Sequence, residues 1–391
     1  MEMLSTTRGN EQMDDQTLQQ DFCQTIIRMA ADLSDDHIGW DQRSEFPWSK
    51  WQLIKDSGIL GLPFPGELGG SDQDLTTTMK TLETLGYSCE DAGLNMAVST
   101  QIVSTGIPLL RFGTIAQKQR YLPRICSGDM ICAHAITEPG GGSDAFGMAT
   151  TVEVQGDHYI LNGKKTLITN GPIADLFVIY AMTNRNLGAL GGGSVFLVER
   201  GNPGFKTGAP IPKMGLRTLQ LSELEFDHCK LSADSLIGKV GLGFPILEYV
   251  MKWEILCGFA INVGEMQRRL EKCIDYAKKR KQFGQSIGSF QAVAHKIVEM
   301  QVGVTTSREQ LYRTALKVQK KENATIDLAI AKLITSEANV QSALNAVQIF
   351  GGKGYLVEHG IEKELRNAIA GTIYSGTSEI QRNKIASMLG I

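Results

Sequence analysis

Apolar and polar positions follow two different periods along the chain, and the period changes twice. Over residues 17–128 apolar side chains recur every three to four positions, which predicts amphipathic helices. Over residues 130–238 they alternate every second position and are rich in β-branched and aromatic types, with a turn at Gly156-Asp157 that predicts a β-hairpin. The helical period returns after Gly243 and lasts to the end of the chain.

This order of elements predicts an α+β fold with separate helical and β domains, because alternating βαβ units are missing from the pattern. We expect a flexible N-terminal extension over residues 1–16 and an α-helical domain over residues 17–129, with one of its helices near Gly93–Phe112. A middle β domain, barrel-like or sandwich-like, is expected over residues 130–238. A C-terminal four-helix bundle is expected over residues 239–391.

Composition excludes several classes of protein. A net charge of −3 over 391 residues gives no electrostatic footprint for nucleic acid. No uncharged apolar run reaches the ~20 residues that a membrane helix needs, and the polar, partly acidic N-terminus differs from a signal or transit peptide. Seven scattered cysteines without a CxxC pair indicate buried, inert thiols in a reducing cytoplasm, and the six histidines show no metal-binding spacing. We therefore expect a cytoplasmic protein that binds neither metal, membrane nor nucleic acid.

A run of three glycines is the first candidate binding motif. Gly140–Gly142 lies between Thr137 and Ser143, and residues without side chains let backbone N–H groups approach a phosphate or a flavin ring. Taken alone, such a run is more often an ordinary loop. No Walker A motif and no GxGxxG after a strand is present, so a nucleotide would have to bind without a Rossmann unit.

Two further motifs lie near the C-terminus. Gln348–Glu358 contains Gly-Gly-Lys-Gly, and in Ile373–Arg382 a glycine precedes Thr377, Ser378 and Glu379. Those three are residues that begin helices, and a helix N-terminus attracts an anion. The only dense basic stretch, residues 278–281, reads in the simplest interpretation as a solvated helix face.

Together and in this order, the motifs resemble the acyl-CoA dehydrogenase family. Thr137–Asp144 and Gln348–Asn367 are similar to its two signature stretches, and the segment that begins at Arg280-Lys-Gln-Phe-Gly is similar to a further landmark. The resemblance covers nearly the whole chain from about residue 20. It implies a flavoenzyme that desaturates an acyl thioester between its α and β carbons, with the thioester on CoA or on the phosphopantetheine arm of a carrier protein. It also implies FAD bound across the interface of a homotetramer or homodimer, with an electron-transferring flavoprotein or O₂ as the electron acceptor.

Motif positions imply two groups of FAD contacts. The contacts from the same chain would be Thr137, Gly142, Ser143, Thr169, Thr377 and Glu379. The contacts lent by a neighbouring subunit would be Arg280, Phe283, Gln291, Gln348 and Gly352. An arginine suits a pyrophosphate because the guanidinium is always charged. Without the family, an exposed arginine would be read as a surface ion pair.

The catalytic base is the main departure from the family pattern. Family chemistry needs a carboxylate to remove the α-proton while the thioester carbonyl accepts hydrogen bonds from the FAD ribityl hydroxyl and from a backbone N–H. That N–H belongs to the residue that is usually the base, which here is Ser375; a serine cannot act as a base without an activator, but its N–H is retained. A smaller branch of the family has its base on an earlier helix. This branch includes isovaleryl- and long-chain acyl-CoA dehydrogenases and resembles enzymes that oxidise prolyl groups on carrier proteins. Alignment on Val263–Leu270 places that base at Glu254.

Helical spacing supports Glu254 independently. Its neighbours three and four positions away are apolar or small: Val250, Met251, Cys257 and Gly258. A carboxylate on an apolar stripe is costly unless it is paired or functional, and burial would raise its pKa. The residues alone leave two interpretations open, a catalytic base or a buried ion pair with a distant cation. The serine at the usual base position favours catalysis.

Two more positions depart from the family. Ile255 stands where an arginine is common, and Leu167 stands where a tryptophan usually covers the flavin close to the docking site of the electron acceptor. Two alternatives therefore remain: an oxidase or monooxygenase of the same fold that uses O₂, and a binding protein that has lost its base.

Overall fold

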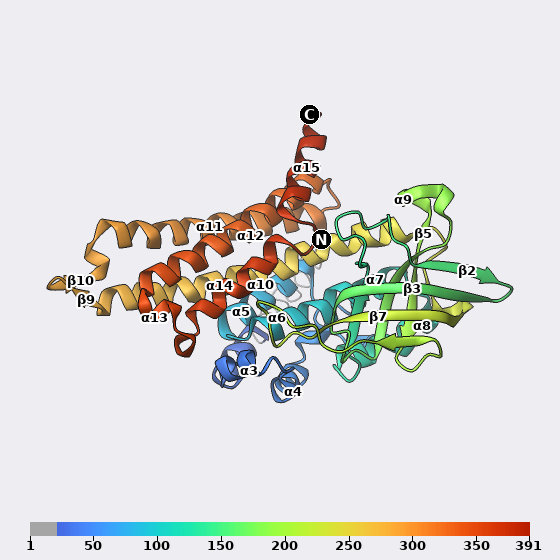
Figure 1. Ribbon diagram of the computed structural model, residues 1–391, viewed down its shortest axis with the longest axis horizontal. Coiled ribbons are helices and arrows are strands. Elements are labelled where there is room, and N and C mark those ends of the chain that lie inside the picture. The colour runs from blue at the N-terminus through green and yellow to red at the C-terminus, as the bar shows by residue number, and fades with distance from the viewer. Residues whose placement is uncertain (1–21) are drawn as a thin grey trace, which may run out of the picture.

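The computed structural model describes residues 22–391, so the extension expected over residues 1–16 lies outside the described part. Helices, a middle sheet and helices follow one another along the chain, which confirms the predicted α+β class. In Figure 1 the sheet forms one end of the molecule and long helices form the other, with the N-terminal helices packed below. None of the described helices is long and apolar enough to cross a membrane. All seven cysteines are buried and unpaired, as their spacing predicted.

The N-terminal region is helical because its apolar positions recur with the helical period and bury one face of each helix. Its helices comprise residues 22–28, α2 (Ala30–Ser34), α3 (His37–Arg43), α4 (Trp48–Ser57), α5 (Leu75–Ser88), α6 (Ala92–Ser99), α7 (Ile107–Phe112) and α8 (Ile115–Cys126).

The helix expected near Gly93–Phe112 is confirmed, but its middle has an unforeseen geometry. Between α6 and α7 the chain continues without a break as the π-helical segment η3 (Thr100–Gly106). All seven residues of η3 are buried, and the segment packs against β1 and α10. π-helical turns are rare and often occur at functional sites.

The β region forms one sheet with strand order β6-β7-β3-β2-β4-β5-β8, and β1 pairs with β4 in parallel. The predicted hairpin joins β2 to β3 through Gly156, whose φ of 64° suits glycine. The strands are β1 (Cys132–Ala135), β2 (Thr151–Gln155), β3 (His158–Thr169), β4 (Leu176–Met182), β5 (Gly193–Glu199), β6 (Phe205–Thr207), β7 (Leu221–Ser232) and β8 (Leu236–Ile237).

Three long helices dominate the C-terminal region, and two shorter ones pack on α12. They are α10 (Gly243–Lys279), α11 (Gln291–Gln319), α12 (Thr325–Phe350), α14 (Ile361–Ile369) and α15 (Ser378–Leu389), with the single turn α13 (Gly352–Tyr355) after α12. Helix α10 has 37 residues and runs from the sheet to the far end of the molecule, where the hairpin β9 (Lys281–Gln282) to β10 (Gln285–Ser286) leads into α11 (Figure 1).

The interpretation of residues 278–281 as a helix face is wrong for half of the stretch. Helix α10 ends at Lys279, Arg280 is its C-cap with extended dihedral angles, and Lys281 already belongs to β9. The physical reason is the Gly284 turn that follows, whose φ of 82° closes the hairpin instead of extending the helix. Arg280 therefore sits at a chain reversal.

Candidate active site

Helix α10 has an open half and a closed half, and Glu254 lies at the boundary between them. From Phe244 to Glu254 most residues are exposed or half-buried, whereas every residue from Ile255 to Ile261 is buried. The apolar stripe predicted around Glu254 is present, because Val250, Cys257 and Gly258 are all buried. Glu254 therefore lies where the partly exposed half of the helix gives way to a fully packed half.

Two serines, and no cation, contact the Glu254 carboxylate. The Ser375 hydroxyl donates to Oε1 at 2.5 Å, and the Ser104 hydroxyl donates to Oε2 at 3.4 Å. Glu254 makes no ion pair with any residue in the range 22–391. Burial raises the pKa of this carboxyl, and the two serine hydrogen bonds oppose that rise. The structure thus favours a basic carboxylate over the buried ion pair that the sequence had left open.

Ser375 lies in the segment between α14 and α15 and has a left-handed backbone. Its φ is 55°, and its carbonyl oxygen accepts a hydrogen bond from Gln381 Nε2 at 3.0 Å. Its own N–H has no partner anywhere in the described chain. A free backbone donor therefore stands next to a carboxylate, which is the pairing that α-proton removal from a thioester requires.

The glycine run is held in place by a buried ion pair. Lys165 and Glu138 are both buried, and Lys165 Nζ lies 2.8 Å from Glu138 Oε1. The same carboxylate accepts the backbone N–H groups of Ala149 at 2.5 Å and Thr150 at 3.0 Å, so it ties together the two ends of the loop. A Cβ added at Gly140 would meet no atom within 4 Å. The loop is anchored at its base while Gly140 faces open space, an arrangement that suits close approach by a ligand.

The other residues predicted to contact the cofactor within one chain lie at the ends of β1 and β3 and at the start of α15. Thr137 and Thr169 are half-buried at the ends of β1 and β3, and Leu167 is 55% exposed at a bulge of β3 with φ 57°. Thr377 is the N-cap of α15 and accepts the Ile380 N–H at 3.2 Å, as predicted for a helix start. Glu379, in the first turn of that helix, is exposed.

The five residues expected to serve a neighbouring subunit gather at the far end of the helical region. Arg280, Phe283 and Gln291 surround the β9–β10 hairpin and are exposed, Phe283 to 94%. Gln348 and Gly352, at the end of α12, reach the same end, where Phe350 stacks on Tyr276 of α10 at 4.2 Å. Along α10, Arg280 is 26 residues from Glu254, about 39 Å at the helical rise. The residues expected to serve a neighbour are therefore far from Glu254 of the same chain.

Sequence reasoning missed three polar groups near the carboxylate. Ser104 lies in an apolar run within the π-helical segment η3 and donates a hydrogen bond to Glu254. The Tyr180 hydroxyl on β4 is buried without a hydrogen-bond partner, and the charge of Glu254 contributes to raising the pKa of that phenol, whose main cause is burial. His134 on β1 packs edge-on against Tyr180 at 5.0 Å, and burial lowers its pKa to about 4. Each owes its place to tertiary packing, so no local signal could identify it.

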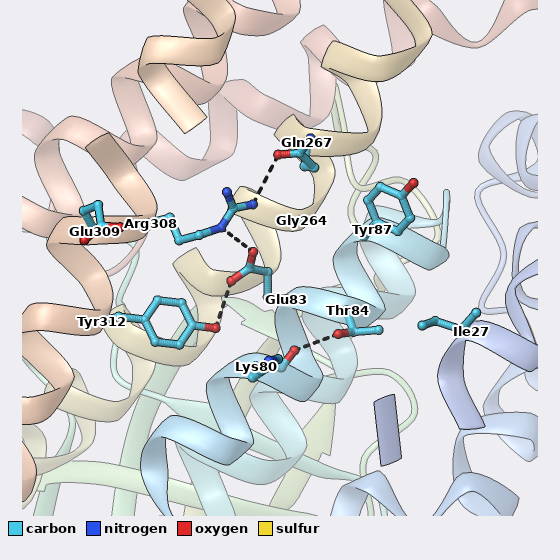
Figure 2. A pocket seen from close by; sticks show the side chains of 10 residues that line it. All are labelled: Ile27, Lys80, Glu83, Thr84, Tyr87, Gly264, Gln267, Arg308, Glu309 and Tyr312. Atoms are coloured by element: carbon cyan, nitrogen blue, oxygen red, sulfur yellow. Dashed lines mark hydrogen bonds and ion pairs between the residues drawn. The ribbon is translucent and has the colours of Figure 1, made fainter. Parts of the chain in front are cut away.

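A cavity away from Glu254 lacks the features of a reaction site. Figure 2 shows this cavity of about 510 Å³ between α5, α10 and α11. Its central carboxylate, Glu83, is already held by Arg308 at 2.8 Å and by the Tyr312 hydroxyl at 2.8 Å. Gly264 on its floor is ten residues, about 15 Å, further along α10 than Glu254. The cavity is therefore separate from the Glu254 site.

Known proteins match this chain along its whole length. Models of the acyl-CoA dehydrogenase N-terminal, middle and C-terminal domains match residues 16–129, 133–229 and 241–390. An L-prolyl-(peptidyl-carrier protein) dehydrogenase of a Serratia species is 38% identical over 95% of this chain and 97% of its own. A short-chain-specific acyl-CoA dehydrogenase of Clostridium acetobutylicum is 34% identical over 89% of this chain and 91% of its own.

Solved structures agree with these matches. The crystal structure of the prolyl acyl carrier protein oxidase AnaB aligns with a TM-score of 0.93 and 43% identity over 96% of this chain and 99% of that chain. PigA with FAD and proline aligns with a TM-score of 0.92 and 37% identity over 100% of this chain and 99% of that chain. Both the fold and the resemblance stated from the motifs are confirmed. The chain therefore belongs to the acyl-CoA dehydrogenase family, the FAD-dependent enzymes that desaturate acyl thioesters between the α and β carbons.

Proposed function

We propose that the protein desaturates a prolyl or similarly compact acyl thioester presented by a carrier protein, with Glu254 as the base. One observation carries this proposal: a carboxylate without a cationic partner lies 2.5 Å from Ser375, whose backbone N–H is free within the described chain. The serine that replaces the usual base thus contacts the glutamate that would take over its role. The named relatives that act on prolyl carrier proteins support the choice of substrate.

The residues present fit FAD. The open glycine loop, the half-buried Thr137 and Thr169, and the N-terminus of α15 all offer donors suited to a phosphate or a flavin. Burial of Glu138 and Lys165 fixes the loop before any ligand arrives, which lowers the entropy lost on binding. When bound, FAD supplies the acceptor for the hydride that leaves the β carbon.

Glu254 is suited to remove the α-proton because burial raises the pKa of its carboxyl group and no nearby cation neutralises its charge. A carboxylate with a higher pKa is a stronger base, provided that it is ionised at the working pH. Ser375 keeps Oε1 in one orientation through its hydroxyl and, in the same residue, offers its N–H to the thioester carbonyl. The carbonyl donor and the base would thereby be held at a fixed distance from each other.

The packing beyond Glu254 favours a compact acyl group. Beside the buried stretch Ile255–Ile261, Gly258 and Ile261 line a cavity of about 10 Å³, roughly enough for one water molecule. Its walls include Asn262 and Glu265, which hydrogen-bond to each other at 3.2 Å. A long apolar chain directed this way would meet a packed helix and then polar, hydrogen-bonded side chains.

A second copy of the chain would complete the site. The exposed cluster around Arg280 and Phe283 lies about 39 Å along α10 from Glu254, so it is placed to serve the cofactor of a neighbour. An aromatic side chain that is 94% exposed is also costly to leave in water, and a partner subunit would cover it. We therefore infer a homodimer or homotetramer, and the seven buried, unpaired cysteines support a reducing cytoplasm as its location.

The electron acceptor is the remaining choice, between an electron-transferring flavoprotein and O₂. Leu167, at the position where the family usually has tryptophan, is 55% exposed and leaves a smaller side chain over that face of the site. We favour O₂, in keeping with the relative described as an oxidase. Oxygen uptake during turnover, with and without an added electron-transferring flavoprotein, separates the two.

Anaerobic bleaching of the visible flavin absorbance tests the proposed reaction. Prolyl-carrier, prolyl-pantetheine and butyryl-CoA thioesters are compared for the wild type and for Glu254→Gln, which keeps the size and the hydrogen-bond acceptor. We expect bleaching by the prolyl thioesters and a loss of about 10²–10⁴-fold in its rate in the variant, as is typical when a general base is removed. Equal rates in both proteins would remove Glu254 as the base.

A further inference from the structure

Three exposed apolar side chains surround the outer end of the open half of α10. Leu187, 59% exposed, is the N-cap of the short helix α9 (Gly188–Gly191), and Leu190, 74% exposed, lies within it. Val240, 50% exposed, lies in the turn before α10. We call these three residues the mouth patch. Isolated exposed leucines are common, but a group of them at the entrance to a site indicates an interaction surface.

Close backbone packing fixes the mouth patch beside α10. A Cβ placed on Gly241 would lie 2.9 Å from the carbonyl oxygen of Gly191, so the two turns touch directly. Figure 1 shows α9 above β5 at the sheet end of α10. The glycine loop reaches the same place, because Phe146 packs on Phe244 of α10 with ring centroids 5.6 Å apart.

The distance from this entrance to the base matches delivery on an arm. Gly243, the first residue of α10, is eleven residues from Glu254, about 16 Å at the helical rise. A thioester group can span that distance only at the tip of a long, thin chain such as phosphopantetheine. The body that carries the arm would remain outside, against the mouth patch.

The side chains at the entrance suit a folded carrier better than a nucleotide. The four residues of α9 are Gly, Ala, Leu and Gly, none with a side-chain hydrogen-bond donor. Leu190 within α9 and Leu187 just before it offer apolar area that a protein surface can bury. Three cations, Arg111, Arg185 and Lys239, lie around the entrance and form no ion pair with any described residue. They complement the anionic phosphodiester that joins the arm to a serine of the carrier.

We propose that the mouth patch is the docking surface for the carrier protein that delivers the thioester to Glu254. This inference rests on the proposed function and adds to it the surface that receives the partner. Docking there places the phosphodiester near the cations and lets the arm run inward along α10.

Leu190→Asp tests the proposal with two forms of one substrate, prolyl thioester on the carrier protein and on free pantetheine. We expect kcat/KM for the carrier form to fall at least ~10-fold, because a charge is placed in the centre of an apolar contact, while the pantetheine form keeps its rate. Val154→Asp is the matched control: Val154 on β2 is 63% exposed and lies outside the mouth patch, so both rates should stay unchanged.

Each other outcome overturns the proposal. Equal losses with both substrates would mean that Leu190 acts on the fold or the cleft, and unchanged rates with both would mean that the carrier docks elsewhere. If the wild type accepts prolyl-CoA and pantetheine thioesters but not the carrier form, the docking surface is refuted while dehydrogenation stands. If no thioester bleaches the flavin, the proposed function itself fails.

Discussion

Removal of the Ser375 hydroxyl should raise the pKa of Glu254 further. In Ser375→Ala the carboxylate loses its 2.5 Å donor, while the backbone N–H stays and the left-handed φ of 55° is equally demanding for serine and alanine. A hydrogen bond to a charged group contributes about 1.5–3 kcal/mol, and about 1.4 kcal/mol corresponds to one pKa unit. The expected change is therefore a rise of about one to two units.

The rate of anaerobic flavin reduction at saturating substrate, measured across pH, reports this pKa. The rising limb of the profile should move to higher pH by about one to two units, because more of the base is protonated at any given pH. Ser104→Ala is the control: its 3.4 Å hydrogen bond is longer and weaker, so the limb should move less. A limb that stays in place, or that moves to lower pH, would refute the assignment of Glu254 as the titrating base.

The same group makes stability depend on pH in a fixed direction. Because burial raises the folded-state pKa of Glu254, the native protein binds more protons than the unfolded chain around that pKa. The unfolding free energy contributed by this group is therefore highest at low pH and falls as pH rises through the folded-state pKa. Ser375→Ala should enlarge that fall, and urea unfolding on both sides of the kinetic limb measures it.

Two further substitutions test the anchors of the cofactor site. Lys165→Met leaves the buried Glu138 carboxylate without its cation and should cost about 3–5 kcal/mol of unfolding free energy, with loss of FAD. Lys164→Met removes only a surface ion pair and should cost at most about 1 kcal/mol. Thermal or urea unfolding measures both. An unchanged stability in Lys165→Met would contradict the role given to the pair. Arg280→Ala should weaken FAD binding about 10–100-fold in a fluorescence titration, because a charge-assisted contact is lost. Lys279→Ala is the control, since Lys279 is one residue earlier and 79% exposed, and it should leave FAD binding unchanged. Equal effects of the two substitutions would indicate that only the general surface charge matters.

Periodicity predicted the order of the domains because it is a local property of the chain. The hairpin at Gly156 and the return of helix after Gly243 follow from turn chemistry and spacing within a few residues. The sequence pattern did not predict short strands such as β6 and β8, because two or three residues are too few to show alternation. These segments are strands because they pair with β7 and β5 in the folded sheet. The π-helical turns of η3 likewise follow from packing against β1 and α10.

The candidate site was predictable to the extent that it depends on one helix. Glu254 stands out on its own stripe by spacing alone, and the family pattern then gave it a role. Its hydrogen bonds could not be foreseen, because Ser375 is 121 positions away and Ser104 is 150 positions away along the chain. Contacts of that kind are set by how α10, η3 and the segment before α15 pack together.

One continuous helix carries both the base and the arginine that a neighbour would use. Helix α10 holds Glu254 in its first half and has Arg280 as its C-cap, so under the proposed function each chain would own one catalytic centre and lend part of another. In a mixed oligomer, a chain with a defective base would still complete the site of an intact neighbour. Defects at Glu254 and at Arg280 that are carried by different chains would therefore leave one intact site in the assembly, whereas the same two defects in one chain would leave the sites of both members impaired.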